Sequence, residues 1–80
     1  TDALEIELHS KKQEKCEKDI QKIIIVLQKY KVKLQPIEIK KLPHIQKFIL
    51  SVIFFVKKNI IYNIIEDLNK LNIKYFLKRL

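Results

Sequence analysis

The side chains that most often carry chemistry are few in this sequence and lie far apart. His9 and His44 are the only histidines, and Cys16 is the only cysteine. No spacing among these three resembles a zinc site, so we expect neither a metal nor a cofactor. Ser51 lies in an apolar run and Ser10 fits a helix N-cap, and neither has an evident general base beside it in the sequence.

The acidic pairs and the absence of glycine also argue against catalysis. Glu5 with Glu7, and Glu66 with Asp67, are typical of solvated surface charges rather than of an acid/base couple. Glycine is absent from the chain, so the Gly-rich loops that cradle phosphate in Walker and Rossmann sites cannot form. The sequence therefore predicts a protein that is not an enzyme.

Positive charge is the most conspicuous chemical feature of the chain. Seventeen Lys and Arg residues against nine Asp and Glu residues give a formal net charge of +8. Sixteen of the seventeen bases are lysine, which lacks the bidentate fork that arginine uses to read bases, so sequence-specific nucleic-acid binding is not expected. Five lysines that surround a proline-containing loop form the predicted basic patch: Lys29, Lys31, Lys33, Lys40 and Lys41.

Length and composition place limits on the organisation of the chain. Its 80 residues make one domain at most, spanning residues 1–80, and the missing initial Met suggests a fragment of a larger protein. A single cysteine suits a reducing compartment, and we expect the cytoplasm. No apolar run reaches the roughly 18 residues that a transmembrane helix needs.

The pattern of apolar residues predicts an all-α fold with one short strand at its start. Residues 4–8 alternate in polarity, which favours a strand whose partner would lie upstream of this fragment. Ser10 and Gln13 resemble a capping box that opens a helix over residues 11–30. Two prolines then suggest a short helical turn over residues 36–41.

The strongest helical pattern follows Pro43. Apolar residues recur at spacings of three and four up to Lys58, which predicts a central helix over residues 43–58. Further apolar stripes predict helical segments over residues 60–71 and 73–80, and the sequence leaves open whether the helices are continuous near Asn59. Surplus apolar side chains on the central helix indicate a protein-binding surface, for which the candidates are Leu50, Phe54 and Phe55.

The order of these segments resembles the NN-CH family of calponin-homology-like domains, and most closely its members in the COMMD-associated endosomal recycling complex. The resemblance is carried by Leu4-Glu5-Ile6-Glu7-Leu8, by Lys22-Ile23-Ile24-Ile25-Val26-Leu27, and by the turn Leu34-Gln35-Pro36-Ile37-Glu38-Ile39. The segment from Ile49 to Lys58 matches the central helix of that family. The resemblance implies a helical scaffold domain that docks protein partners beside a coiled coil.

Two functions follow as expectations. The first is a non-catalytic scaffold that binds other protein subunits of an intracellular assembly, with endosomal trafficking as the setting. The alternative is electrostatic binding of a polyanion, either the acidic tails of microtubules or RNA, through the predicted basic patch. Among these partners the sequence alone makes nucleic acid the less favoured, because Tyr30 is the only aromatic residue among the patch lysines and single strands require stacking platforms.

Overall fold

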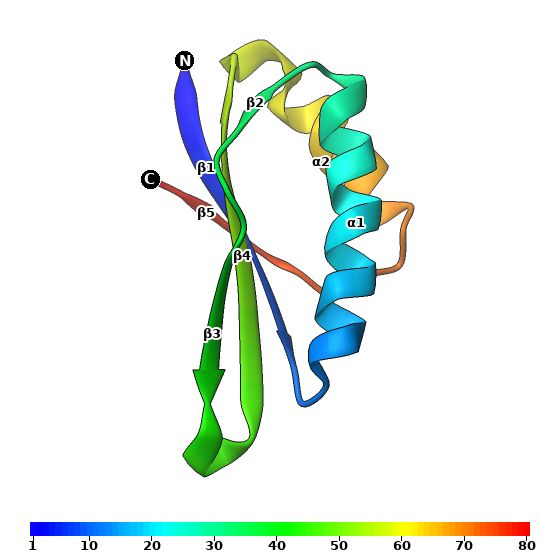
Figure 1. The fold of residues 1–80 in the computed structure, drawn as a ribbon. Coiled ribbons are helices and arrows are strands. Elements are labelled where there is room, and N and C mark those ends of the chain that lie inside the picture. Colours follow the sequence, from blue (N-terminus) through cyan, green and yellow to red (C-terminus); the bar gives the residue numbers. More distant parts are fainter.

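The fold is an antiparallel sheet with two helices packed on one of its faces. A computed structural model describes all residues from 1 to 80 and shows this arrangement (Figure 1). In chain order the elements are β1 (Asp2–Ser10), α1 (Gln13–Lys29), β2 (Lys33–Leu34), β3 (Glu38–Leu42), β4 (Lys47–Val56), α2 (Ile61–Asn69) and β5 (Phe76–Arg79), with 3-10 turns at Pro43–Ile45 and Lys58–Ile60.

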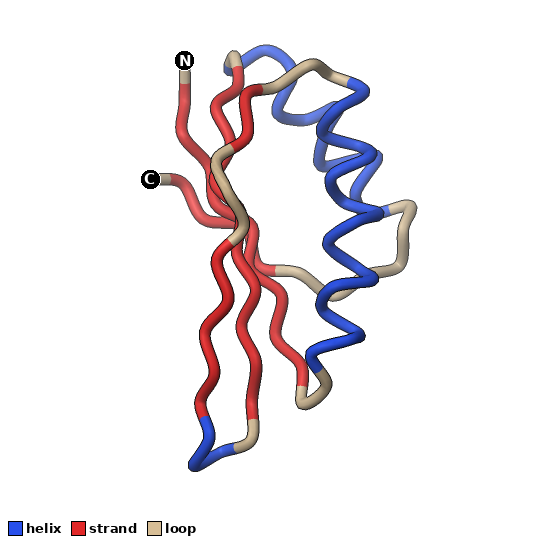
Figure 2. The backbone as a smooth tube through the Cα atoms, in the orientation of Figure 1, coloured by secondary structure: helices blue, strands red, loops and turns tan.

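The strand order is β2-β4-β1-β5, and β3 pairs with the same edge of β4 as β2 does. All pairings are antiparallel, including the nine-residue ladder between β1 and β4. Taken together, β2 and β3 act as one interrupted strand, so the chain follows the β-α-β-β-α-β path of ferredoxin-like domains. Both helices lie on one side of the sheet, and the opposite face, here called the open face, is left uncovered (Figure 2).

Strand periodicity decides which side chains enter the core. Alternate residues of β1 and β4 face the helices, and their neighbours point to the open face. The helices contribute residues spaced by three or four positions, which lie on one helix face. The core consists of thirteen buried side chains: Leu4, Ile6, Leu8, Cys16, Ile20, Ile23, Leu27, Leu50, Val52, Phe54, Val56, Ile64 and Leu68.

The all-α, calponin-homology-like fold class predicted from the sequence is wrong. Two of the predicted segments are confirmed as helices, at Gln13–Lys29 and Ile61–Asn69, and the alternating segment at the start is confirmed as a strand. That strand, however, finds both of its partners, β4 and β5, later in the same chain. The coiled-coil context inferred with the helical fold has no support in this sheet-based structure.

The central helix predicted over residues 43–58 is instead a 3-10 turn followed by strand β4. An apolar run this continuous satisfies the helical and the strand period equally well, so periodicity alone cannot separate the two. The composition of the run favours a strand, because β-branched and aromatic residues pack well on a pleated surface. Since β4 ends at Val56 before a separate turn and α2, the question of helix continuity near Asn59 is settled: the segments are not one helix.

The other two predicted helical segments are also strands. Residues 36–41 were expected to form a helical turn after Pro36, but Glu38–Leu42 extends along β4 as β3. The stripe predicted over residues 73–80 becomes β5, an edge strand beside β1. The capping box is absent too: the side-chain oxygen of Ser10 accepts a hydrogen bond from the backbone N–H of Lys12 at 3.1 Å, and α1 has no side-chain cap.

Turns in this chain are made without glycine. Lys31, Gln46 and Asn72 adopt the left-handed conformation, with φ of 56°, 48° and 56°. For residues with a Cβ atom this conformation costs about 1–2 kcal/mol, which glycine avoids. These three residues therefore occupy turn positions where glycine would be usual.

The tip of the β3–β4 hairpin offers a direct test of this cost. We expect Gln46→Gly to raise the free energy of unfolding by up to about 1 kcal/mol, because the strain of φ 48° disappears. As a control, Gln21→Gly in the middle of α1 is expected to lower it by about 1 kcal/mol, because glycine is a poor helix former. Urea denaturation followed by circular dichroism measures both values, and a destabilised Gln46→Gly variant would contradict the assignment of strain.

Candidate nucleic-acid interface

The three residues predicted as a protein-binding surface occupy two different environments. Leu50 and Phe54 are 1 % and 0 % exposed, because both point from β4 towards the helices. Phe55 follows Phe54 along the strand and therefore points to the open face, where it is half-buried. Leu50 and Phe54 are core residues without a contact surface for a partner, whereas Phe55 lies on the uncovered open face together with Ile49 and Ile53.

The predicted basic patch divides between the two ends of the molecule. Lys33 pairs with Phe55 on β4, whereas Lys40 pairs with Ile49. These partners are six residues apart on one strand, which corresponds to about 20 Å. Lys29 and Lys31 lie with Lys33 at one end, and Lys40 and Lys41 lie on the β3–β4 hairpin at the other end.

Lys29 forms an ion pair with Asp67 that joins α1 to α2. Its Nζ lies 3.0 Å from the carboxylate of Asp67, and the Tyr30 hydroxyl donates to the same carboxylate oxygen at 2.5 Å. The hydrogen bond from Tyr30 and then that from Lys29 lower the pKa of Asp67, and the hydrogen bond to Asp67 raises the pKa of Tyr30. Lys70 adds a longer contact at 3.8 Å. This cluster links α1 to α2 and engages Lys29 with Asp67.

A different set of lysines converges at the hairpin end of the sheet. A cavity of about 350 Å³ lies there between the end of β1, the hairpin and the segment before β5. Lys11, Lys47 and Lys74 come to it from three separate segments, and none of the three forms an ion pair. The cavity, here called the basic pocket, is lined by His9, Ser10, Lys11, Ile45, Lys47, Lys74 and Phe76, with no acidic residue among them.

Two rings lie beside these lysines. The Phe76 ring, on a residue that is 45 % exposed, has its centroid 4.8 Å from that of His9, with the planes inclined at 56°. His9 is oriented by a hydrogen bond of 3.2 Å between its Nε2 and the carboxylate of Glu7, which also lies 3.2 Å from Nζ of Lys78. The bond to His9 is the main reason that the pKa of Glu7 is lowered, with Lys78 adding to it against the opposing effect of burial. The Phe76 ring therefore packs against an oriented His9 side chain and leaves part of its surface exposed.

The hairpin extends this basic surface. Residues 38–41 of β3 are exposed; Lys40 pairs with Ile49 and points to the open face, whereas Lys41 pairs with Phe48 and points to the other face of the hairpin. Nζ of Lys41 lies 5.9 Å from the centroid of the Phe48 ring, which places a second cation beside an aromatic group. Figure 1 shows the hairpin reaching beyond the end of α1, so a long ligand can approach it without meeting the helices.

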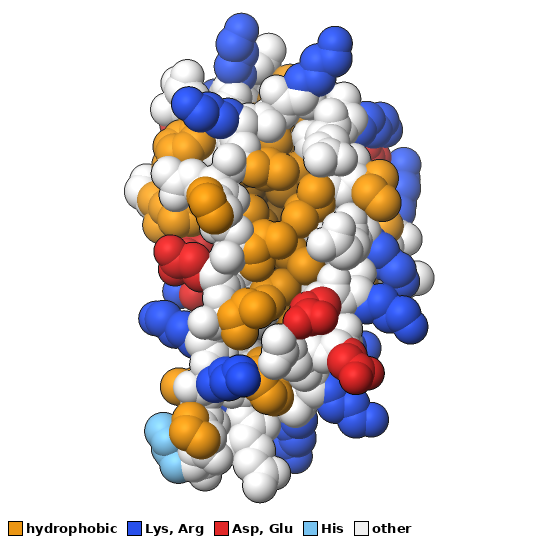
Figure 3. Space-filling model, in the orientation of Figure 1, with side chains coloured by type: hydrophobic (Ala, Val, Ile, Leu, Met, Phe, Trp, Pro, Cys, Tyr) orange, Lys and Arg blue, Asp and Glu red, His pale blue; other side chains and the backbone are white.

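Lysine and arginine side chains surround the apolar parts of the surface. In the space-filling view they stand around a seam of hydrophobic side chains where the sheet meets α1 (Figure 3). Exposed apolar side chains of this molecule include Ile25, Ile37 and Ile39. Positive charge is therefore available on several sides, and the basic pocket combines three lysines free of ion pairs with the exposed ring of Phe76.

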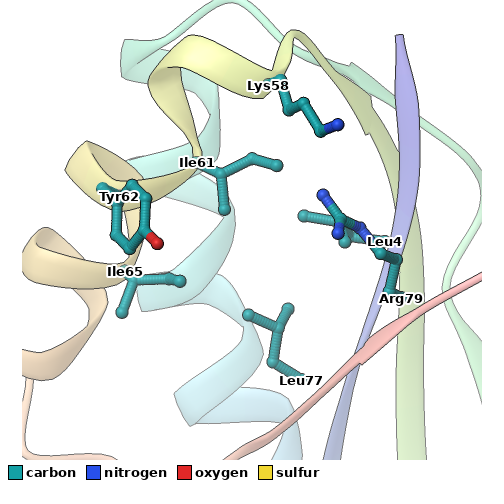
Figure 4. Close-up of a pocket in the computed structure, with 7 residues that line it drawn as sticks. All are labelled: Leu4, Lys58, Ile61, Tyr62, Ile65, Leu77 and Arg79. Atoms are coloured by element: carbon teal, nitrogen blue, oxygen red, sulfur yellow. The ribbon is translucent and has the colours of Figure 1, made fainter.

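A second cavity lies on the helix side of the sheet. It measures about 500 Å³ and lies between α2 and the paired strands β1 and β5 (Figure 4). Its lining is mainly aliphatic, with Lys58, Tyr62 and Arg79 as the residues that carry polar atoms. This cavity, here called the apolar groove, is lined by Leu4, Lys58, Ile61, Tyr62, Ile65, Leu77 and Arg79.

Of the groups considered for catalysis or metal binding, His9, Ser10 and Cys16 line one pocket, and His9 is hydrogen-bonded to Glu7. No cluster of three or more His, Cys, Asp and Glu side chains has a geometry that could hold a metal ion. The Cys16 thiol is buried, lies 3.8 Å from the carbonyl oxygen of Leu8, and has a pKa raised mainly by that burial. His44 is exposed in the hairpin turn. Neither α-helix has the length and apolar character required to cross a membrane.

Comparison with solved structures finds similar folds at low sequence identity. The de novo designed protein Foldit4 has a TM-score of 0.76 and 16% identity, over 99% of this chain and 94% of that one. A putative glycine cleavage system transcriptional repressor has a TM-score of 0.64 and 7% identity, over 99% of this chain and 46% of that one. The designed protein Ferredog-Diesel gives 0.51 and 15%, over 95% and 83%.

No protein-family model matches the sequence, and no curated protein matches it significantly. The solved structures share an α+β arrangement with this chain, and none of them is a calponin-homology domain. The resemblance to the NN-CH family is therefore wrong. It was based on short apolar strings, and such strings occur in strands as readily as in helices.

Proposed function

We propose that this domain binds single-stranded nucleic acid at the basic pocket. The observation that carries the proposal is the convergence of Lys11, Lys47 and Lys74, all free of ion pairs, around the exposed ring of Phe76. Proteins that bind single strands combine cationic side chains, which follow the phosphates, with aromatic side chains on which bases stack. In this pocket, the lysines would contact phosphates while Phe76 would stack against one base.

This proposal replaces the scaffold function as the favoured one. The scaffold rested on a family resemblance that the fold contradicts and on Leu50 and Phe54, which are buried. Between the polyanions, nucleic acid is favoured over acidic protein tails because every nucleotide carries a planar base that can stack on Phe76. The lysine content suits binding with little sequence preference, since a lysine is a point charge without a bidentate fork. We retain the proposals of a non-catalytic role and of a reducing compartment such as the cytoplasm.

Binding to a short fluorescein-labelled oligo(U), measured by anisotropy, tests the proposal. A contact area of three to five lysines predicts that log K falls with log salt with a slope of about −2 to −4. Phe76→Ala is expected to cost about 1–3 kcal/mol of binding free energy, because a base loses its stacking partner. Tyr62→Ala is the matched control, since Tyr62 is 82 % exposed but lies on α2, away from the basic pocket.

Two outcomes would contradict the proposal. If wild-type protein does not bind oligo(U) at low salt, the basic pocket is not a nucleic-acid site. If Phe76→Ala and Tyr62→Ala bind as tightly as wild type, the ligand is held by charge alone, and a glutamate-rich peptide should then compete equally well. Oligo(dT) in parallel shows whether the sugar contributes to recognition.

A further inference from the structure

The apolar groove and the free edge of β5 form one continuous surface. Ile61 and Ile65 extend from α2 towards the sheet, and Leu4 and Leu77 face them from β1 and β5 (Figure 4). β5 is the last strand of the sheet, so no further strand closes the groove on that side. The surface therefore combines an unpaired strand edge with a hydrophobic recess directly beside it.

The pairing register shows which backbone groups of β5 are free. The N–H of Leu80 donates to the carbonyl oxygen of Ala3 at 2.9 Å, which makes this a hydrogen-bonded pair. Hydrogen-bonded and non-hydrogen-bonded pairs alternate along an antiparallel ladder, so Lys78 and Phe76 also direct their backbone groups to β1. The backbone groups of Leu77 and Arg79 consequently point outward, and their side chains line the groove.

The pairing of β5 with β1 shows which side chains lie opposite this strand in the sheet. There it pairs with β1, in which apolar residues alternate with Glu5 and Glu7. The acids of β1 meet the cations of β5: Lys78 lies 3.2 Å from Glu7, and Arg79 lies 2.8 Å from Asp2. On the outer side, Lys58 and Arg79 stand at the groove with Lys58 free of any ion pair.

We propose that an extended segment of a partner protein, with alternating apolar and acidic side chains, adds to β5 as a sixth strand. Its backbone pairs with Leu77 and Arg79. Its apolar side chains, opposite those two residues, enter the groove against Ile61 and Ile65. Its acidic side chain opposite Lys78 lies on the other face of the sheet, beside that lysine. The groove and the basic pocket have no lining residue in common, so the two proposals are tested with separate variants.

The test uses an acetylated and amidated peptide with the sequence Leu-Glu-Ile-Glu-Leu, titrated into the full chain labelled with ¹⁵N. The largest amide shifts are expected at Leu77 and Arg79 and along α2. Arg79→Pro removes an outward N–H while leaving the pairing with β1, since proline is accepted on the solvent side of an edge strand. It should weaken binding more than tenfold beyond Arg79→Ala, which loses the same charge and the same ion pair with Asp2 but keeps the N–H.

Ile65→Asp provides a second variant, because it places a negative charge in the groove without touching β5. It should also weaken binding at least tenfold, and thermal melting confirms that each variant is folded. Equal binding by Arg79→Pro and Arg79→Ala would overturn the strand-addition geometry. If the peptide does not bind, the assignment to an acidic partner segment is overturned. It is also overturned if the free protein self-associates and Arg79→Pro abolishes that self-association, which would assign the edge to another copy of this chain.

Discussion

Replacing Phe54 by alanine is expected to lower the free energy of unfolding by about 3–5 kcal/mol. Phe54 is 0 % exposed and stands in the middle of β4, on the face that both helices cover. Truncation removes a large apolar side chain and leaves a cavity that the surrounding sheet and helices fill only in part. A domain of this size is stable by roughly 4–12 kcal/mol, so the loss is a large part of the total.

Phe55→Ala is the matched control for this change. The two residues are adjacent in β4 and identical in type, but Phe55 is half-buried on the open face. We expect Phe55→Ala to lower the free energy of unfolding by less than half as much, because the Phe55 side chain buries less apolar area on folding than the Phe54 side chain does. Chemical denaturation followed by circular dichroism gives both values. Equal losses of stability in the two variants would contradict the orientation of β4. A Phe54→Ala protein as stable as wild type would contradict the burial of Phe54.

Replacing Lys11, Lys47 and Lys74 together by glutamine is expected to lower the affinity for oligo(U) about 100-fold at 0.1 M salt. Each phosphate contact with a single strand contributes about 0.7 to the slope of log K against log salt, which amounts to roughly fivefold in affinity at this concentration. Three contacts multiply to about two orders of magnitude, and the slope itself becomes less steep by about 2. None of the three lysines forms an ion pair, so stability should change little.

The control removes the same number of charges from the other end of the molecule. Lys31, Lys33 and Lys57 lie near the end of β4 that is remote from the hairpin. Replacing them by glutamine changes the net charge equally, so a non-specific attraction would fall by the same factor in both triple variants. A large difference locates the site at the basic pocket. Equal losses would show that affinity follows net charge alone.

The sequence predicted local elements well where one period was clear. The spacing of Cys16, Ile20, Ile23 and Leu27 fits a helix and little else, and that helix is present. The alternation around Glu5 and Glu7 similarly predicted a strand. Over β4, by contrast, nearly every residue is apolar, so the helical and strand periods coincide and the evidence lies in side-chain shape instead. Giving more weight to the β-branched and aromatic residues would have identified the strand.

The candidate site could not be predicted because its residues are brought together by strand pairing. Lys11, Lys47 and Lys74 are far apart in the chain, and only the register of β1 against β4 and β5 makes them neighbours. The predicted patch used proximity in sequence, which groups Lys33 with Lys40, although the length of a strand separates them. Phe76 was not identified as a site residue either, because it lies in a segment that the sequence predicted to be helical. A correct sheet topology is the information that was missing.

The central position of β1 has a consequence for how the chain folds. Glu5 pairs with Ile53 on one side and with Lys78 on the other, so both partners of the first strand are made much later. Contacts between residues so distant in sequence slow folding, because the chain loses the entropy of closing large loops before these contacts contribute stability. During synthesis both edges of β1 therefore remain unpaired until β4 and β5 have been made, and in that interval the strand is able to pair with another chain.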